Sequence, residues 1–101
     1  MSENRMIQLS EPEISGNEWK YIKECLDIGW VSSVGGYVDK FEKMLASYSG
    51  RGYAVATVNG TSALHVSLMA CGISPGDEVI VPALTFIAPV NAVRYCGAYP
   101  V

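Results

Sequence analysis

Apolar residues near the start of the chain recur at the spacing of an amphipathic helix. Trp19, Ile22 and Leu26 follow residues 15–18, Ser-Gly-Asn-Glu, which match the capping box that begins many helices. In that motif the Ser and Glu side chains each satisfy an N–H group at the helix start. We therefore expect a helix that runs from this box to about residue 28 and ends at Gly29.

A second amphipathic helix is predicted farther along. Its apolar stripe consists of Val38, Phe41, Leu45 and Tyr48. Lys40, Glu42 and Lys43 are expected on the other face, and Gly50 is expected to end the helix. Residues 30–36, between the two helices, follow neither the helical nor the strand period, so we expect a loop, with room for a short strand, that could line a site.

Short apolar runs in the second half alternate with helical segments. Residues 53–58 and 79–81 have few polar atoms, as expected for strands buried on both faces of a parallel sheet. Helices are expected over residues 62–71, closed by Gly72, and 88–95, ended by Gly97. A third strand is predicted to begin at Ala98. The order strand, helix, strand, helix, strand predicts an α/β fold with a mainly parallel sheet.

Composition narrows the class of protein. With 101 residues, half of them hydrophobic, the chain is long enough for one domain with a single core. Its net charge is −3 and its basic residues are scattered, so neither nucleic acid nor a membrane is an expected partner. The three cysteines fit neither a disulfide framework nor a zinc site, so we expect no metal. No apolar signal segment is evident, and we expect a cytoplasmic protein.

Charge is distributed unevenly along the chain. Of the seven basic and ten acidic residues, only Asp77, Glu78 and Arg94 lie beyond Tyr53. The second half therefore looks built for burial, and the chain stops in an apolar stretch that resembles the start of a strand. We expect a fragment whose missing remainder covers this half.

Residues 59–64, Asn-Gly-Thr-Ser-Ala-Leu, join the first predicted strand to the helix that follows it. At such a junction the first backbone N–H groups of the helix lack partners and lie at the positive end of the helix dipole. Gly60 would let a phosphate approach closely, and Thr61 and Ser62 would add hydroxyl donors. The turn predicts a phosphate site, and the alternative is a helix start that is only well capped.

Phe86 follows the second predicted strand. In an open α/β sheet, ligands bind beyond the carboxyl ends of the strands, so residues 59–62 and 82–86 are expected to face one crevice. There the Phe86 ring could stack on a flat heterocycle, although on pattern alone it is more typical of a core aromatic. The sequence contains neither G-x-G-x-x-G nor a P-loop, so pyridoxal 5'-phosphate is favoured over a dinucleotide or a nucleoside triphosphate.

Five segments carry a specific resemblance, residues 7–12, 29–35, 59–64, 74–79 and 82–92. Through them nearly the whole chain resembles the DegT-type pyridoxal-phosphate-dependent aminotransferases, which act on nucleotide-linked keto sugars. Residues 17–26 and 30–33 look most like the 4-aminotransferases of legionaminic acid pathways. The resemblance implies the N-terminal part of a fold type I large domain, an α/β/α sandwich.

The same resemblance implies roles for individual residues. Gly60, Thr61 and Ser62 would bind the cofactor phosphate, and Phe86 would stack on the pyridine ring. The loop that contains Trp30, Ser32 and Ser33 would lie near the nucleotide-sugar substrate. Glutamate is the implied amino donor, and a homodimer is implied because the family's active sites form between two subunits.

One departure limits what the chain can do alone. The family uses a Schiff-base lysine and an acidic partner of the pyridinium nitrogen, both of which lie later in the sequence. The lysines present are Lys20, Lys23, Lys40 and Lys43, all on the two predicted N-terminal helices, where a solvated, salt-bridging role is expected.

We therefore expect residues 1–101 to be the truncated N-terminal part of a single cofactor-binding domain. Residues 1–52 would supply the helices and the substrate loop, and residues 53–101 would begin the βαβαβ sheet. The fragment alone is expected to be inactive, and the intact protein to be a nucleotide-sugar aminotransferase. Two alternatives are a non-catalytic truncated protein that acts by interaction and a lysine-less, dehydratase-like relative.

Overall fold

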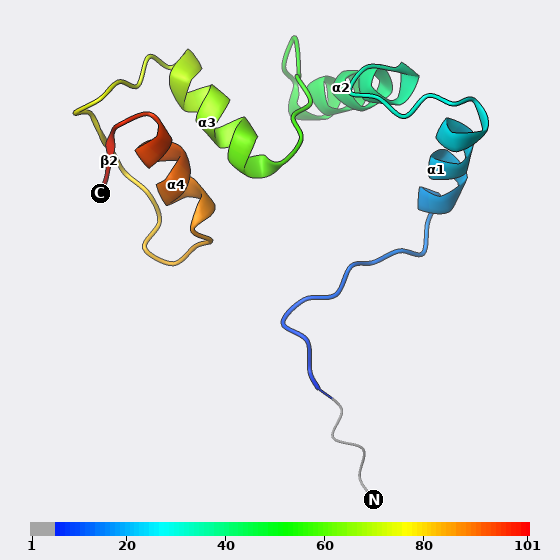
Figure 1. Cartoon of the computed structure of the whole chain (residues 1–101), viewed down its shortest axis with the longest axis horizontal. Helices are drawn as coiled ribbons and strands as arrows, with labels where there is room; N and C mark the ends of the chain where they lie inside the picture. The colour runs from blue at the N-terminus through cyan, green and yellow to red at the C-terminus, as the bar shows by residue number, and fades with distance from the viewer. Residues whose placement is uncertain (1–5) are drawn as a thin grey trace, which may run out of the picture. The chain divides into compact units, whose positions relative to one another are not determined.

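The computed structural model of the chain describes residues 6–101. The chain divides into two units, Met1–Gly35 and Gly36–Val101. Within the described residues, the first unit contains one helix, α1 (Glu18–Asp27), and the second contains the remaining helices and two short strands (Figure 1).

Helix α1 begins differently from the expected capping box. Asn17 is the N-cap residue, and no side chain caps the helix. Glu18 reaches back instead, and its carboxylate accepts a hydrogen bond from the Gly16 amide at 2.9 Å. The capping role predicted for Ser15 is therefore wrong, because the helix starts two residues later than that role requires. The predicted end is confirmed, with Gly29 in the left-handed region at φ 69°.

The second unit contains five elements in chain order. They are α2 (Gly36–Ser49), α3 (Gly60–Ala70), β1 (Glu78–Val79), α4 (Ala88–Tyr95) and β2 (Tyr99–Pro100). Glycines at positive φ follow all three helices, as the sequence predicts for Gly50, Gly72 and Gly97. In the part of the chain that the structure describes, no helix has the length and apolar character needed to cross a membrane.

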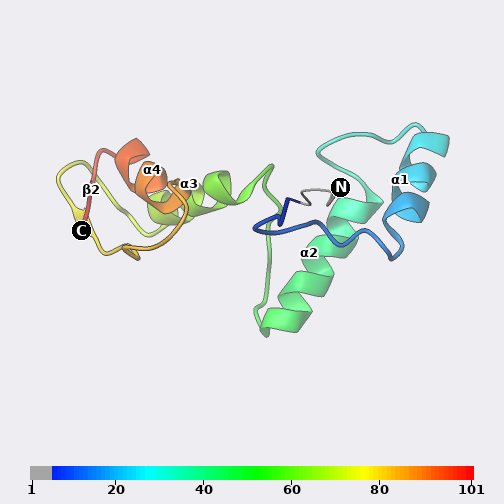
Figure 2. The same ribbon diagram turned by 90° about the horizontal axis from the view of Figure 1, so that it is seen from below.

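Strands β1 and β2 pair in parallel, with helix α4 as the crossover between them. Glu78 pairs with Tyr99 and Val79 with Pro100. Helix α3 packs beside α4, where the rings of His65 and Tyr95 meet edge to face at 5.5 Å. Figures 1 and 2 show α3 and α4 running in the same direction, so the N-termini of both helices lie at one end of the pair.

The buried core is much smaller than the sequence predicts. Among residues 6–101, only the hydrophobic residues Ala92, Val93 and Ala98 are fully buried. They belong to α4 and to the residue before β2, so the core lies within the β1–α4–β2 unit and its contact with α3.

The prediction of a buried strand over residues 53–58 is wrong in this structure. The segment pairs with no strand among the described residues, and the Val55 side chain is 81% exposed. The second predicted strand, 79–81, is present as Glu78–Val79, but Ile80 is 88% exposed rather than buried. A strand is buried on both faces only when other elements pack on each side of it, and residues 6–101 do not supply those elements. The apolar run alone therefore did not determine burial of the strand.

Candidate functional site

Asn59 organises the turn that precedes α3. Its backbone is extended, at φ −163° and ψ 170°, and its Oδ1 atom accepts a hydrogen bond from the Ser62 amide at 2.8 Å. Its carbonyl oxygen accepts from the Ala63 amide at 3.1 Å and from the Thr57 hydroxyl at 2.9 Å. These bonds satisfy part of the helix start and fix how the chain enters it.

Two main-chain donors of the turn remain open. Across residues 6–101, the amides of Gly60 and Thr61 have no hydrogen-bond partner, and neither do the hydroxyls of Thr61 and Ser62. A Cβ atom built on Gly60 would meet nothing within 4 Å, so the space beside the turn is free. This donor set fits a phosphate group, with Ser62 offering its hydroxyl because its amide already bonds to Asn59.

Phe86 lies directly before the N-cap residue of α4, Ile87. Its side chain is 86% exposed and lines a shallow hollow with Leu84 and Thr85. That hollow does not include the turn before α3. The structure therefore sets Phe86 and the turn before two helices that run in the same direction, and it leaves the aromatic ring free to contact a ligand.

The Trp30 indole packs within its own loop, residues 30–35, and holds that loop closed. Trp30 Nε1 donates a hydrogen bond to the Val34 carbonyl oxygen. Gly35 has φ 154°, and a side chain there would collide with the Trp30 indole. The hydroxyls of Ser32 and Ser33 are exposed and have no hydrogen-bond partner among the residues that the structure describes.

The lysines lie on α1 and α2, as expected, and not at the turn before α3. Lys23 forms the predicted type of contact, an ion pair with Asp27 at 2.5 Å. Lys40 lies over the Tyr37 ring, with its Nζ 5.9 Å from the ring centroid. Within residues 6–101, no group of three or more His, Cys, Asp and Glu side chains is arranged to hold a metal ion.

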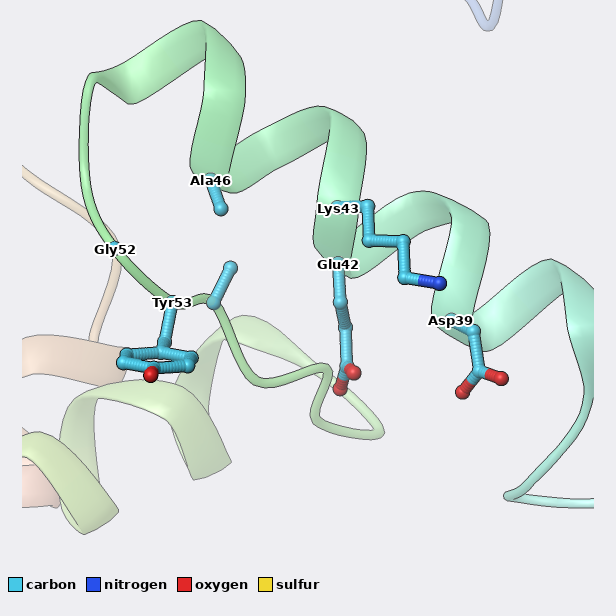
Figure 3. Close-up of a pocket in the computed structure, with 7 residues that line it drawn as sticks. Asp39, Glu42, Lys43, Ala46, Gly52 and Tyr53 are labelled. Carbon is cyan, nitrogen blue, oxygen red and sulfur yellow. The ribbon is translucent and has the colours of Figure 1, made fainter.

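Glu42 has a role that sequence reasoning missed. It was expected on the solvated face of α2, but it is half-buried and its Oε1 atom accepts a hydrogen bond from the Ala56 amide at 2.7 Å. It lines a groove of about 300 Å³ between α2 and the following segment (Figure 3). Fourteen residues separate the two partners, so no local pattern indicates their contact. The one signal was the position of Glu42, one helical turn from Val38 and Leu45 of the apolar stripe.

The parallel β1–α4–β2 unit and the open donors before α3 define an α/β protein in which the start of one helix presents unpaired hydrogen-bond donors. The chain belongs to the DegT/DnrJ/EryC1/StrS aminotransferase family, whose sequence profile matches residues 12–101. This confirms the predicted family.

Two relatives within the family illustrate the similarity in detail. The GDP-perosamine synthase of Caulobacter vibrioides is 54% identical over 101 residues, which are all of this chain and 27% of that protein. The GDP-perosamine synthase of Vibrio cholerae is 50% identical over 96 residues, which are 95% of this chain and 26% of that protein. The chain thus spans about a quarter of the length of these curated relatives. Both are named for perosamine, whereas the predicted subfamily was that of legionaminic acid pathways.

A solved structure supports the fold. A protein from Streptococcus pneumoniae, assigned as a sugar aminotransferase and determined in its PLP form, matches with a TM-score of 0.83 at 34% identity. The match covers 94% of this chain and 24% of that one. The chain therefore has the fold of the N-terminal part of these aminotransferases, in agreement with the predicted α/β class.

Proposed function

We propose that this chain is the N-terminal quarter of a pyridoxal-phosphate-dependent aminotransferase that adds an amino group to a nucleotide-linked keto sugar. The observation that carries this proposal is the 54% identity to a GDP-perosamine synthase along the whole chain. By that relationship the product is a nucleotide-linked amino sugar, with a GDP-linked sugar as the first substrate to test. Glutamate is the proposed donor.

The turn before α3 is the proposed phosphate site. The Gly60 and Thr61 amides would donate to phosphate oxygens, and the hydroxyls of Thr61 and Ser62 would add donors from the side. The positive end of the α3 dipole favours the same anion. Because Asn59 already bonds the Ser62 amide, the turn is held in shape before any ligand arrives.

The other proposed roles follow the family resemblance and the exposure of the side chains. The Phe86 ring would lie against the pyridine face and orient it. Trp30 would shape the loop that faces the nucleotide sugar, while the open hydroxyls of Ser32 and Ser33 would bind its polar groups. When bound, the cofactor would supply an electron-accepting ring and an aldehyde that can carry an amino group.

The residues that hold the cofactor covalently are proposed to lie outside this chain. The four lysines are on α1 and α2, and Lys23 is already paired with Asp27. We further propose that the intact protein is a cytoplasmic homodimer, as the family resemblance implies. Extensive exposure of apolar side chains, such as Val58 at 89%, supports the view that further chain covers this surface.

The test uses the intact gene product. Incubation with pyridoxal 5'-phosphate, glutamate and a GDP-linked keto sugar should convert the sugar ketone to an amine and release 2-oxoglutarate, both followed by mass spectrometry. The matched control replaces the GDP-linked sugar with its UDP-linked counterpart and should give less product. Binding of cofactor with no transfer to any keto sugar would contradict the proposal.

Two alternatives make different predictions in the same assay. A dehydratase-like relative would bind the cofactor and consume the sugar without gaining nitrogen from glutamate. A protein that acts only by interaction would bind no cofactor and change neither substrate. Sequencing of the gene beyond the codon for Val101 separates these cases further, because the aminotransferase requires a lysine there.

A further inference from the structure

One hydrogen bond connects α2 to the segment that leads into the phosphate turn. Glu42 Oε1 accepts from the Ala56 amide at 2.7 Å. Among residues 6–101 it is the one hydrogen bond that joins residues 53–58 to α2. Ala56 lies three residues before Asn59, whose side chain caps α3. The hydrogen bond at Ala56 therefore restrains the chain close to the donors of the turn.

The surroundings of this bond let the segment lie close to the helix. Ala54 and Ala56 are half-buried, whereas Tyr53, Val55 and Thr57 are exposed, so alternate residues of an extended segment point in opposite directions. Ala46 of α2 lines the same groove as Ala54, and Figure 3 shows its methyl group directed toward the segment. Small side chains on both sides allow the Glu42 carboxylate to reach a main-chain amide.

We propose that Glu42 is a positioning residue for cofactor binding: it holds residues 53–58 against α2 and so fixes where the Asn59–Ser62 turn presents its donors. The inference rests on the proposed function, because it assigns a phosphate to that turn. A carboxylate suits the task because a hydrogen bond from an amide to a charged acceptor is stronger than one between neutral groups. Glu42 itself donates nothing to the phosphate and takes no part in the chemistry.

Three substitutions at one position separate the possible roles of Glu42 in the intact protein. Glu42→Ala removes the acceptor. Glu42→Asp keeps the charge but shortens the side chain by one methylene, and Glu42→Gln keeps the length and an acceptor oxygen while losing the charge. Asp39→Ala is the matched control, since Asp39 lines the same groove on α2 and its carboxylate makes no hydrogen bond within the described part of the chain.

The first measurement is amide hydrogen exchange without any ligand, followed on peptides that cover residues 52–58 and 59–64. Glu42→Ala and Glu42→Asp should exchange several-fold faster in both peptides, because the segment has lost its bond to α2. Glu42→Gln should exchange at a rate between those of Glu42→Ala and the parent protein, because it keeps an acceptor but loses the charge. Asp39→Ala should match the parent protein. Unchanged exchange in Glu42→Ala would overturn the proposal. If Glu42→Ala does not fold, the exchange rates of Glu42→Asp decide the test instead.

The second measurement compares affinity for pyridoxal 5'-phosphate with affinity for pyridoxal, which lacks the phosphate. Glu42→Ala should weaken binding of the phosphorylated form about tenfold, the scale of one displaced hydrogen-bonding group, and leave pyridoxal binding unchanged. Glu42→Gln should restore the affinity to within about twofold. Equal losses for both ligands, or no recovery with Gln, would contradict a positioning role.

Failure of the proposed function gives a different result from failure of this inference. If the parent protein binds pyridoxal 5'-phosphate no better than pyridoxal, the phosphate turn is wrong. Glu42 then fails as a cofactor-positioning residue as well, even if exchange shows that it holds the segment. If the parent protein prefers the phosphorylated form and Glu42→Ala does too, to the same degree, only the role of Glu42 is overturned.

Discussion

At the scale of single residues, neighbouring residues in the turn before α3 have different roles: one caps the helix, and two keep unpaired amides. Asn59 satisfies the helix by accepting from the Ser62 amide, and this leaves Gly60 and Thr61 with open amides. The sequence indicated a helix start near residues 60–62 but not this division, because a pattern does not tell which amide a cap will occupy. In the proposed phosphate site, affinity would therefore depend on two main-chain amides and on the empty space beside Gly60.

Gly60→Ala should affect binding and stability in opposite directions. The new methyl group would occupy the space that a phosphate needs and should weaken affinity for pyridoxal 5'-phosphate in the intact protein by about tenfold. The free energy of unfolding should stay the same or rise by about 0.5 kcal/mol, since alanine favours helix and Gly60 has no positive φ to lose. Titration with the cofactor and urea denaturation measure the two effects.

Gly36→Ala is the matched control for that substitution. Gly36 also begins a helix, and a Cβ atom there also meets nothing within 4 Å. It should leave cofactor affinity unchanged. An equal loss of affinity in both variants would show that the effect of Gly60→Ala does not arise from a blocked phosphate site.

At the scale of elements, helix ends followed from sequence more reliably than strands did. Gly29, Gly50, Gly72 and Gly97 each end a helix as predicted, because a residue at positive φ is a local requirement that glycine meets. The strand predicted at residues 53–58 is absent, since a strand needs a partner and a local pattern does not supply one. The Glu42–Ala56 bond was missed for the same reason.

Gly97 and Gly72 allow the cost of backbone conformation to be separated from that of a steric clash. Both have positive φ, 75° and 83°, but only at Gly97 would a Cβ atom meet a neighbour, Pro75 Cγ at 3.0 Å. Gly72→Ala should destabilise by about 1 kcal/mol from φ alone. Gly97→Ala should cost more by roughly another 1 kcal/mol, because Pro75 must shift. Urea denaturation of the two variants measures the difference, and equal losses would show that Pro75 yields freely.

At the scale of the whole molecule, the chain presents more apolar surface than its small core can bury. Full burial is confined, among the described hydrophobic residues, to Ala92, Val93 and Ala98, while Leu84 and Phe86 are 96% and 86% exposed. Curated relatives are roughly four times as long, as the 27% coverage shows. The predicted burial of the second half thus depends on chain that the proposed intact protein would add.

The 101-residue chain by itself should not react with the cofactor at one defined lysine. Its lysines lie on α1 and α2, and none is at the phosphate turn. Addition of pyridoxal 5'-phosphate followed by borohydride should leave only scattered, substoichiometric labels, whereas the intact protein should label at one lysine beyond Val101. Peptide mapping by mass spectrometry tests this. A single dominant adduct on the short chain would contradict it.

The exposed segment at residues 53–58, Tyr-Ala-Val-Ala-Thr-Val, also affects the tendency of the chain to aggregate in a cell. It is rich in β-forming residues and has no charge, proline or glycine, which is the composition of segments that stack into intermolecular cross-β ladders. The bond to Glu42 protects one of its amides and leaves the rest of the edge unpaired among the described residues. A 101-residue chain with this segment uncovered is therefore expected to bind chaperones, and its aggregation should rise with concentration.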